Sequence, residues 1–95
     1  MDVFRREDHE EEAELLKALG HPTRLWIVKQ LAGGEHCVCD FVNAVGVKFA
    51  TVSQHLAVLK QAGILSDEKR GKSVFYRLAD ARAAGILECL EKGAE

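Results

Sequence analysis

The stretch from Lys48 to Gly63 constrains the fold more than any other part of the chain. Val52, Leu56 and Leu59 fall on one side of a 3.6-residue helical wheel, which predicts an amphipathic helix. Gly63 is suited to end this helix. Small or polar residues occupy the opposite side: Thr51, Gln54, Ala57 and Gln61. A helix with such a face can lie in the major groove of DNA, about 12 Å wide, although an ordinary surface helix has the same pattern.

The length and the apolar content predict one domain that buries a subunit interface. A chain of 95 residues buries only a modest core by itself, yet 47% of its residues are apolar. This surplus predicts a homodimer. We take residues 1–95 as a single domain in which residues 1–8 form a flexible arm.

The charges are segregated along the chain, although the net charge is only −2. Six carboxylates lie between residues 7 and 14, whereas Lys69, Arg70, Lys72 and Arg77 cluster late. A negative net charge counts against a non-specific nucleic-acid binder. A basic patch on an acidic protein still attracts phosphate locally.

Neither a signal peptide nor a membrane span is expected. The first 14 residues are acidic and polar, and no apolar run approaches the length of about 18 residues that a membrane helix needs. We therefore expect a cytoplasmic protein whose three cysteines, Cys37, Cys39 and Cys89, form no disulfide framework. Such cysteines can bind metal, sense redox state or simply pack.

The residues before the Lys48–Ala62 helix predict three further helices. A helical stripe runs over residues 9–19, and Pro22 suits the first turn of a second helix. A short apolar segment that ends at Gly46 predicts a third helix. Together with the fourth helix it would form a helix-turn-helix.

A basic hairpin follows the expected helix-turn-helix. Within residues 64–80 apolar and polar side chains alternate, and Gly71 and Lys72 mark the turn. Asp80 then starts a last helix over residues 80–92. The order ααααββα predicts a mainly helical fold with a small β-hairpin, a winged helix-turn-helix.

Two parts of the chain supply the residues that we expect to bind DNA. They are the Lys48–Ala62 helix, called the reading helix, and the turn of the hairpin with its flanking residues, called the wing tip. Side chains of the helix can reach base edges, and basic side chains at the wing tip suit phosphate contacts. The candidate residues are Lys48, Thr51, Ser53, Gln54, Lys69, Arg70 and Lys72. A run of charges on a turn is usually only solvated, but beside this helix we favour DNA binding.

Four segments together resemble the ArsR/SmtB family of metal-responsive repressors. They are HPTRLWIVKQL, CVCD, TVSQHLAVLKQAGIL and GKSVFYRL. Members of this family are small winged-helix homodimers, so the resemblance implies a dimer built on the first and last helices. It also implies a repressor that occupies double-stranded operator DNA until an inducer binds.

The resemblance also indicates which inducer site the chain retains. The family's zinc site on the last helix is absent, because Arg82 and Gly93 replace its two histidines, although Asp80 matches. CVCD resembles the arsenic-sensing and the cadmium- and lead-sensing branches. The arsenic type has a third cysteine where this chain has Val42, and the cadmium and lead type has cysteines in the arm, where this chain has none.

Cys37 and Cys39 are the candidate ligands for a thiophilic ion, with Cys89 as the candidate third ligand. Thiolates are soft ligands that suit such ions, and arsenite takes three of them. Inside a regular helix, residues two apart point about 200° away from each other, so both thiols reach one ion only at a non-helical helix start. Cys89, from either subunit, can instead be a packed apolar residue.

Four histidines and one aspartate complete the set of candidate side chains. Harder ions could bind beside the cysteine pair through His36, Asp40 or the arm's His9. His21 and His55 are interpreted as structural residues, His21 at the break between two helices and His55 beside the buried face of the reading helix.

The leading hypothesis is a repressor, with no permanently bound cofactor, that arsenite or antimonite releases from its operator. Drawing Cys37 and Cys39 to one ion would distort the start of the third helix and shift the reading helix. Two alternatives remain: a sensor of Cd²⁺, Pb²⁺ or Zn²⁺, and a thiol-redox repressor that pairs Cys37 or Cys39 with Cys89. The chain has no recognisable nucleophile–base pair, so we do not expect an enzyme.

Overall fold

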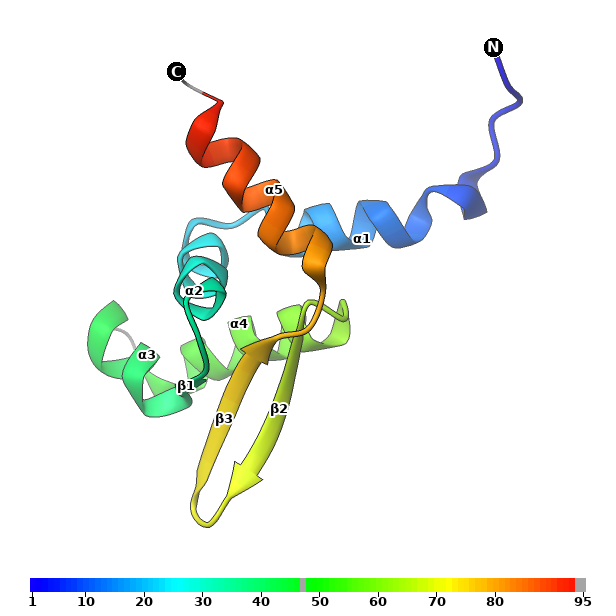
Figure 1. The fold of residues 1–95 in the computed structure, drawn as a ribbon. Helices are drawn as coiled ribbons and strands as arrows, with labels where there is room; N and C mark the ends of the chain where they lie inside the picture. Colours follow the sequence, from blue (N-terminus) through cyan, green and yellow to red (C-terminus); the bar gives the residue numbers. More distant parts are fainter. Residues whose placement is uncertain (47, 94–95) are drawn as a thin grey trace.

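The helices and strands follow the order of a winged helix-turn-helix (Figure 1). The computed structural model describes residues 1–46 and 48–93. The helices are α1 (Glu10–Leu19), α2 (Pro22–Ala32), α3 (Val38–Val45), α4 (Phe49–Gln61) and α5 (Ala81–Lys92), and the strands are β1 (His36–Cys37), β2 (Leu65–Arg70) and β3 (Ser73–Leu78). A 3₁₀ turn at Arg6–Asp8 lies in the segment that the sequence suggested as a flexible arm.

The sheet contains one strand that the sequence did not predict. β1 pairs antiparallel with β3, so the strand order is β1-β3-β2. His36 lies opposite Tyr76, and Cys37 lies opposite Phe75. The predicted hairpin is present as β2 and β3, and β1 is an addition that escaped prediction because a strand of two residues is too short to show alternation in the sequence. This strand ties the start of α3 to the wing.

Side-chain caps and one glycine set the ends of the helices. The Nδ1 atom of His21 accepts a hydrogen bond from the Thr23 N–H at 3.1 Å, at the start of α2. Asp80 Oδ1 accepts one from the Arg82 N–H at 2.9 Å, at the start of α5. Gly46 has a φ of 73°, a left-handed conformation that side chains rarely tolerate, and it ends α3 before α4 begins. The structural role predicted for His21 is confirmed.

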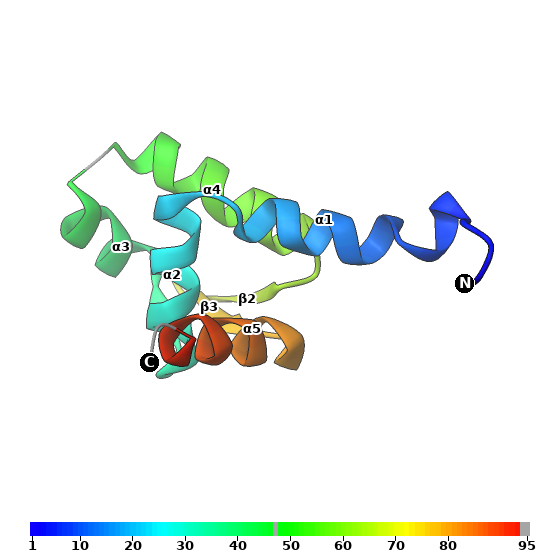
Figure 2. The same cartoon turned by 90° about the horizontal axis from the view of Figure 1, so that it is seen from above.

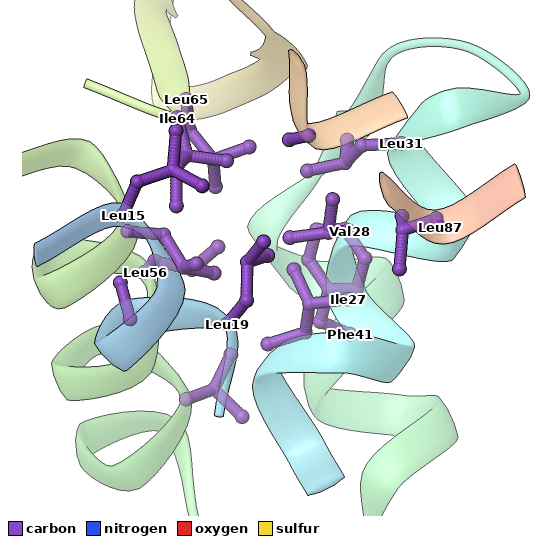
Figure 3. Close-up of a cluster of buried hydrophobic side chains, with 14 residues drawn as sticks. Leu15, Leu19, Ile27, Val28, Leu31, Phe41, Leu56, Ile64, Leu65 and Leu87 are labelled. Atoms are coloured by element: carbon purple, nitrogen blue, oxygen red, sulfur yellow. The ribbon is translucent and has the colours of Figure 1, made fainter. Parts of the chain in front are cut away.

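One apolar cluster joins all five helices to the base of the wing (Figure 3). Its buried members are Leu15, Ala18, Leu19, Ile27, Val28, Leu31, Phe41, Val52, Leu56, Leu59, Ile64, Leu65, Ala83 and Leu87. The inner stripe of α4, formed by Val52, Leu56 and Leu59, is 0% exposed. This burial fixes the opposite face of α4 toward solvent, as the helical wheel predicted.

The wing and the two outer helices lie on different sides of the molecule. In Figure 1 the β2–β3 hairpin extends away from the body, while α1 and α5 cover the opposite side. Seen from above, α2 lies between α4 and α5, and it contacts both (Figure 2). Over residues 1–46 and 48–93, no helix has the length and apolar character needed to cross a bilayer.

Val52→Ala is expected to lower the free energy of unfolding by about 2 kcal/mol, because it removes buried methyl groups and leaves a cavity. Val58, on the same helix, is 41% exposed. Val58→Ala is therefore the matched control and should cost no more than about 0.5 kcal/mol. Urea denaturation at one fixed protein concentration measures both. Equal losses would contradict the orientation of α4.

Candidate DNA-reading surface and thiolate pair

The outer face of α4 presents the side chains that the sequence analysis expected to reach DNA. The exposed residues on this helix and its N-cap include Lys48, Thr51, Gln54, Ala57 and Gln61, whereas Ser53 is half-buried. The carbonyl of Lys48 accepts hydrogen bonds from the N–H groups of Thr51 and Val52, at 3.0 and 3.2 Å. The first turn of α4 is thus well formed, and its side chains project from a rigid element.

Phe49 is an exposed aromatic residue at the start of α4 that the sequence analysis missed. It is the first residue of the helix and is 59% exposed. An apolar ring at this position can contact a thymine methyl group in a major groove. A signal was present in the sequence, since a large aromatic residue follows directly after Lys48 at the predicted helix start.

The wing tip offers two exposed lysines and one arginine that is held by carboxylates. Among the described residues, neither Lys69 nor Lys72 has a carboxylate within ion-pair distance. Arg70 instead donates from Nη1 and Nη2 to both carboxylate oxygens of Glu35, at 2.6 and 2.8 Å. Its Nε donates to Glu68 at 2.6 Å. The hydrogen bonds that Arg70 donates to Glu35 and then to Glu68 raise the pKa of its guanidinium group, so Lys69 and Lys72 are better placed than Arg70 to meet phosphate.

Cys37 and Cys39 lie where β1 passes into α3, at the non-helical start that joint coordination requires. Cys37 is the N-cap of α3, and its Sγ accepts a hydrogen bond from the Cys39 N–H at 3.4 Å. Asp40 closes the capping box, because its Oδ2 accepts from the Cys37 N–H at 3.3 Å. His36 Nδ1 lies 3.3 Å from the same oxygen. The residues proposed for harder ions, His36 and Asp40, are therefore beside the thiol pair.

The two thiols differ in exposure and in acidity. Cys37 is 8% exposed, whereas Cys39 is exposed to solvent. The side chain and then the N–H of Cys39 donate hydrogen bonds to Cys37 and lower the pKa of the Cys37 thiol. Donating that hydrogen bond raises the pKa of the Cys39 thiol. Cys37 is therefore the more acidic thiol of the pair, because its neighbour donates hydrogen bonds to it.

The structure does not bring Cys89 to this pair within one protomer. Cys89 is exposed on α5, which packs on α2, while Figure 1 places β1 and α3 on the side of the wing. Over residues 1–46 and 48–93, no three His, Cys, Asp or Glu side chains come together so as to hold a metal ion. The alternative that Cys89 packs as a core residue does not hold within a single protomer, because Cys89 is exposed.

His55 lies on the partly buried side of the reading helix α4 in a small polar cluster, as expected of a structural residue. Its ring centroid is 4.5 Å from that of His21, and its Nδ1 is 3.4 Å from Nη1 of Arg24. Arg24 also donates from Nε to the carbonyl of Ala18 at 2.6 Å. Burial, followed by His21 and Arg24, lowers the pKa of His55. The cluster links α4 to the connection between α1 and α2.

Comparison with known proteins identifies the family of this chain. A family model described as "Bacterial regulatory protein, arsR family" matches residues 21–67. The arsenical resistance operon repressor of Escherichia coli is 46% identical over 79 residues, 79% of this chain and 68% of that one. The chain belongs to the arsR family. The resemblance seen in the sequence is confirmed, and arsR-family members are transcriptional regulators rather than enzymes.

Two further comparisons give the share of each similar protein that this chain covers. The repressor SmtB of Mycobacterium tuberculosis is 47% identical over 74 residues, 78% of this chain, and this chain spans only 55% of its length. The homodimeric winged helix-turn-helix DNA-binding domain of Mycobacterium bovis, solved by NMR, has a TM-score of 0.82 at 28% identity. That match covers 99% of this chain and 89% of the other. The winged helix-turn-helix predicted from the sequence is thereby confirmed.

Cys37 is expected to ionise at lower pH than Cys39, because it receives the hydrogen bonds that Cys39 donates. Two variants isolate the thiols: Cys39→Ser with Cys89→Ser keeps only Cys37, and Cys37→Ser with Cys89→Ser keeps only Cys39. Serine can still donate or accept the hydrogen bond between the two positions. Thiolate absorption in the ultraviolet, followed as the pH rises, measures each one. Ionisation of Cys39 first would contradict the capping arrangement.

Proposed function

We propose that this chain is a homodimeric repressor that binds double-stranded operator DNA and is released when a thiophilic ion, first of all arsenite, binds Cys37 and Cys39. The observation that carries the proposal is the position of the thiols. Cys37 caps α3, Cys39 lies in the first turn of α3, and α3 packs against the reading helix α4. An ion at this position acts directly on the element that reads DNA.

The DNA-bound arrangement places α4 in the major groove and the wing on the backbone. Thr51, Gln54 and Phe49 approach base edges from the exposed face of α4, while Lys48 and Ser53 lie beside them at its first turns. Lys69 and Lys72 contact phosphates from the wing tip. Arg70 contributes mainly by holding the wing in place, because two carboxylates already engage it. The expected site of action is the cytoplasm.

A second copy of the chain is the expected partner. Leu16 on α1 and Leu90 on α5 are 56% and 59% exposed, which is unusual for large apolar side chains in helices that otherwise bury their apolar face. Both helices lie on the side away from the wing (Figure 1), so pairing there leaves both wings accessible. The homodimeric Mycobacterium bovis domain supports this assembly.

The release mechanism starts at the cap of α3. Joint binding of one ion by Cys37 and Cys39 replaces the hydrogen bond that Cys37 Sγ accepts from the Cys39 N–H. The start of α3 then changes shape, and α4 shifts with it. A coupling of about 1–3 kcal/mol weakens operator binding roughly 5- to 150-fold. Arsenite needs a third thiolate, for which Cys89 of the partner subunit remains the candidate.

One observation favours a second candidate inducer. His36 and Asp40 lie beside Cys37, and imidazole and carboxylate ligands suit Zn²⁺ or Cd²⁺ better than arsenite. A site made of two thiolates with these two side chains would need no contribution from Cys89, but among the described residues these side chains are not gathered around one point and would have to rearrange to bind an ion. Parallel operator-release titrations with arsenite, Cd²⁺, Pb²⁺ and Zn²⁺ distinguish the two candidates. Release by an oxidant alone, with formation of a disulfide to Cys89, would instead indicate the redox alternative.

Gln54→Ala is expected to lower affinity for the cognate operator by about 1–3 kcal/mol and to spare random DNA, because a glutamine can pair with an adenine edge. Gln61→Ala, at the far end of the same face, is the matched control with little effect. Lys72→Ala should weaken binding to both DNAs and reduce the salt slope by about one unit. Binding assays at several salt concentrations measure all three. Similar behaviour of Gln54→Ala and Lys72→Ala would refute this division of roles.

Cys37→Ser and Cys39→Ser should each leave operator binding intact and abolish release by arsenite. Serine keeps the size of the side chain and can still cap α3, but a hydroxyl does not replace a soft thiolate. Operator binding measured against arsenite concentration gives the result. If both single variants release DNA at the arsenite dose of the original protein, this thiol pair is not the sensor.

Cys89→Ser then tests the third ligand. If Cys89 of the partner subunit binds the ion, the arsenite dose for release rises at least tenfold, a loss of about 1.4 kcal/mol. If the arsenite dose for release is unchanged, another residue supplies the third ligand. Mixed dimers of Cys89→Ser subunits with Cys37→Ser/Cys39→Ser subunits supply a control, because only a site shared between subunits is altered by mixing.

A further inference from the structure

Glu35 makes the contact that joins the thiol-bearing segment to the tip of the wing. It lies directly before β1, which ends at Cys37, and it accepts two hydrogen bonds from Arg70 at the end of β2, at 2.6 and 2.8 Å. Such a bidentate pair fixes direction as well as distance. The side chain of Glu35 is 32% exposed and that of Arg70 is 44% exposed. This ion pair is therefore less weakened by water than a pair between fully exposed side chains.

The surroundings of Arg70 hold its guanidinium group against the central strand of the sheet. Its central carbon lies 4.8 Å from the centre of the Phe75 ring. Phe75 is the residue opposite Cys37 in the β1–β3 pair. Arg77 extends the network, with Nη1 3.9 Å from Glu35 and 3.7 Å from Glu68. The segment that carries Cys37 is thus attached to β3 through the backbone and to β2 through Glu35.

We propose that Glu35 is a positioning residue that transmits ion binding at Cys37 and Cys39 to the wing. This inference rests on the function proposed above and adds a second route from the thiol pair to DNA, besides the one through α3 and α4. When the ion draws the two thiols together, β1 moves. The Glu35–Arg70 pair then makes the wing move with β1, which displaces Lys69 and Lys72 from the phosphates.

The pairing of β1 with β3 is too short to transmit this movement alone. It comprises two residue pairs, whereas β2 and β3 form six. Without Glu35, β1 can adjust to the ion while the longer hairpin keeps its place. Glu68 offers a contrast, because it binds the same arginine from within β2 and, among the described residues, forms ion pairs only with Arg70 and Arg77 of the hairpin.

Glu35→Gln and Glu68→Gln therefore form a matched pair of variants. Each removes one negative charge and weakens one partner of Arg70, so both change the general attraction to DNA alike. Operator affinity is measured without and with saturating Cd²⁺, and the ratio of the two values is the coupling. Cd²⁺ binding itself is followed separately through the ultraviolet absorption of the cadmium–thiolate bonds. Arsenite serves as a second probe in the same design.

In Glu35→Gln we expect the coupling ratio to fall at least about threefold, out of a typical 5- to 150-fold range. Cd²⁺ binding should stay close to that of the original protein, and operator affinity without the ion should match that of Glu68→Gln. Glu68→Gln should retain the full ratio. As a readout that needs no DNA, Cd²⁺ should change hydrogen exchange of the β3 amides in the original protein and in Glu68→Gln, but much less in Glu35→Gln.

Three results would overturn the inference in distinguishable ways. If Glu35→Gln keeps the full coupling ratio while the ion releases the original protein, the wing route is wrong and the proposed function stands. A loss of operator affinity by the same factor with and without ion would show that Glu35 only stabilises the fold. If the original protein binds the ions but keeps its operator, the proposed function fails, and the wing route fails with it.

Discussion

Burial of the inner stripe of α4 is the constraint on which the DNA-reading geometry depends. Val52, Leu56 and Leu59 are withdrawn from water completely, so α4 has one rotational setting in which its apolar side chains remain covered. Lys60 adds a lateral restraint, because its Nζ pairs with Asp67 of β2 at 2.9 Å. The reading helix and the wing are thereby held in a fixed relation. A surface that must match both a DNA groove and its flanking phosphates requires such a fixed relation.

The start of α3 combines a structural and a chemical task in the same atom. The Sγ of Cys37 caps the helix, and it is also the atom that a soft ion would bind. Ion binding at the proposed site would therefore compete with a hydrogen bond of the fold. Because Cys37 belongs to the sheet and its neighbours belong to α3, a local change of ligand reaches both the wing and the helix-turn-helix. This proximity would remove the need for a long pathway between the proposed ion site and the DNA surface.

The sequence predicted those parts of the molecule that depend on periodicity or on turn residues. The stripe of Val52, Leu56 and Leu59, the turn at Gly46 and the cap at Asp80 all lie where the residue types indicated. β1 escaped prediction because two residues show no period, and Glu35 escaped because its partner is 35 positions away in the chain. The exposure of Cys89 was missed for a related reason: an apolar run such as ILECL does not reveal which side of its helix is covered.

The segregation of charge also governs how such a molecule meets DNA. The carboxylates of α1 lie on the side of the body away from the wing tip, where Lys69 and Lys72 are exposed (Figure 1). The protein is thus an electric dipole with a net charge of −2. In the field of a phosphate backbone a dipole experiences a torque that turns its positive end forward. The negative net charge slows the approach of the protein to DNA from every direction. This torque, however, favours encounters in which the wing meets the DNA first.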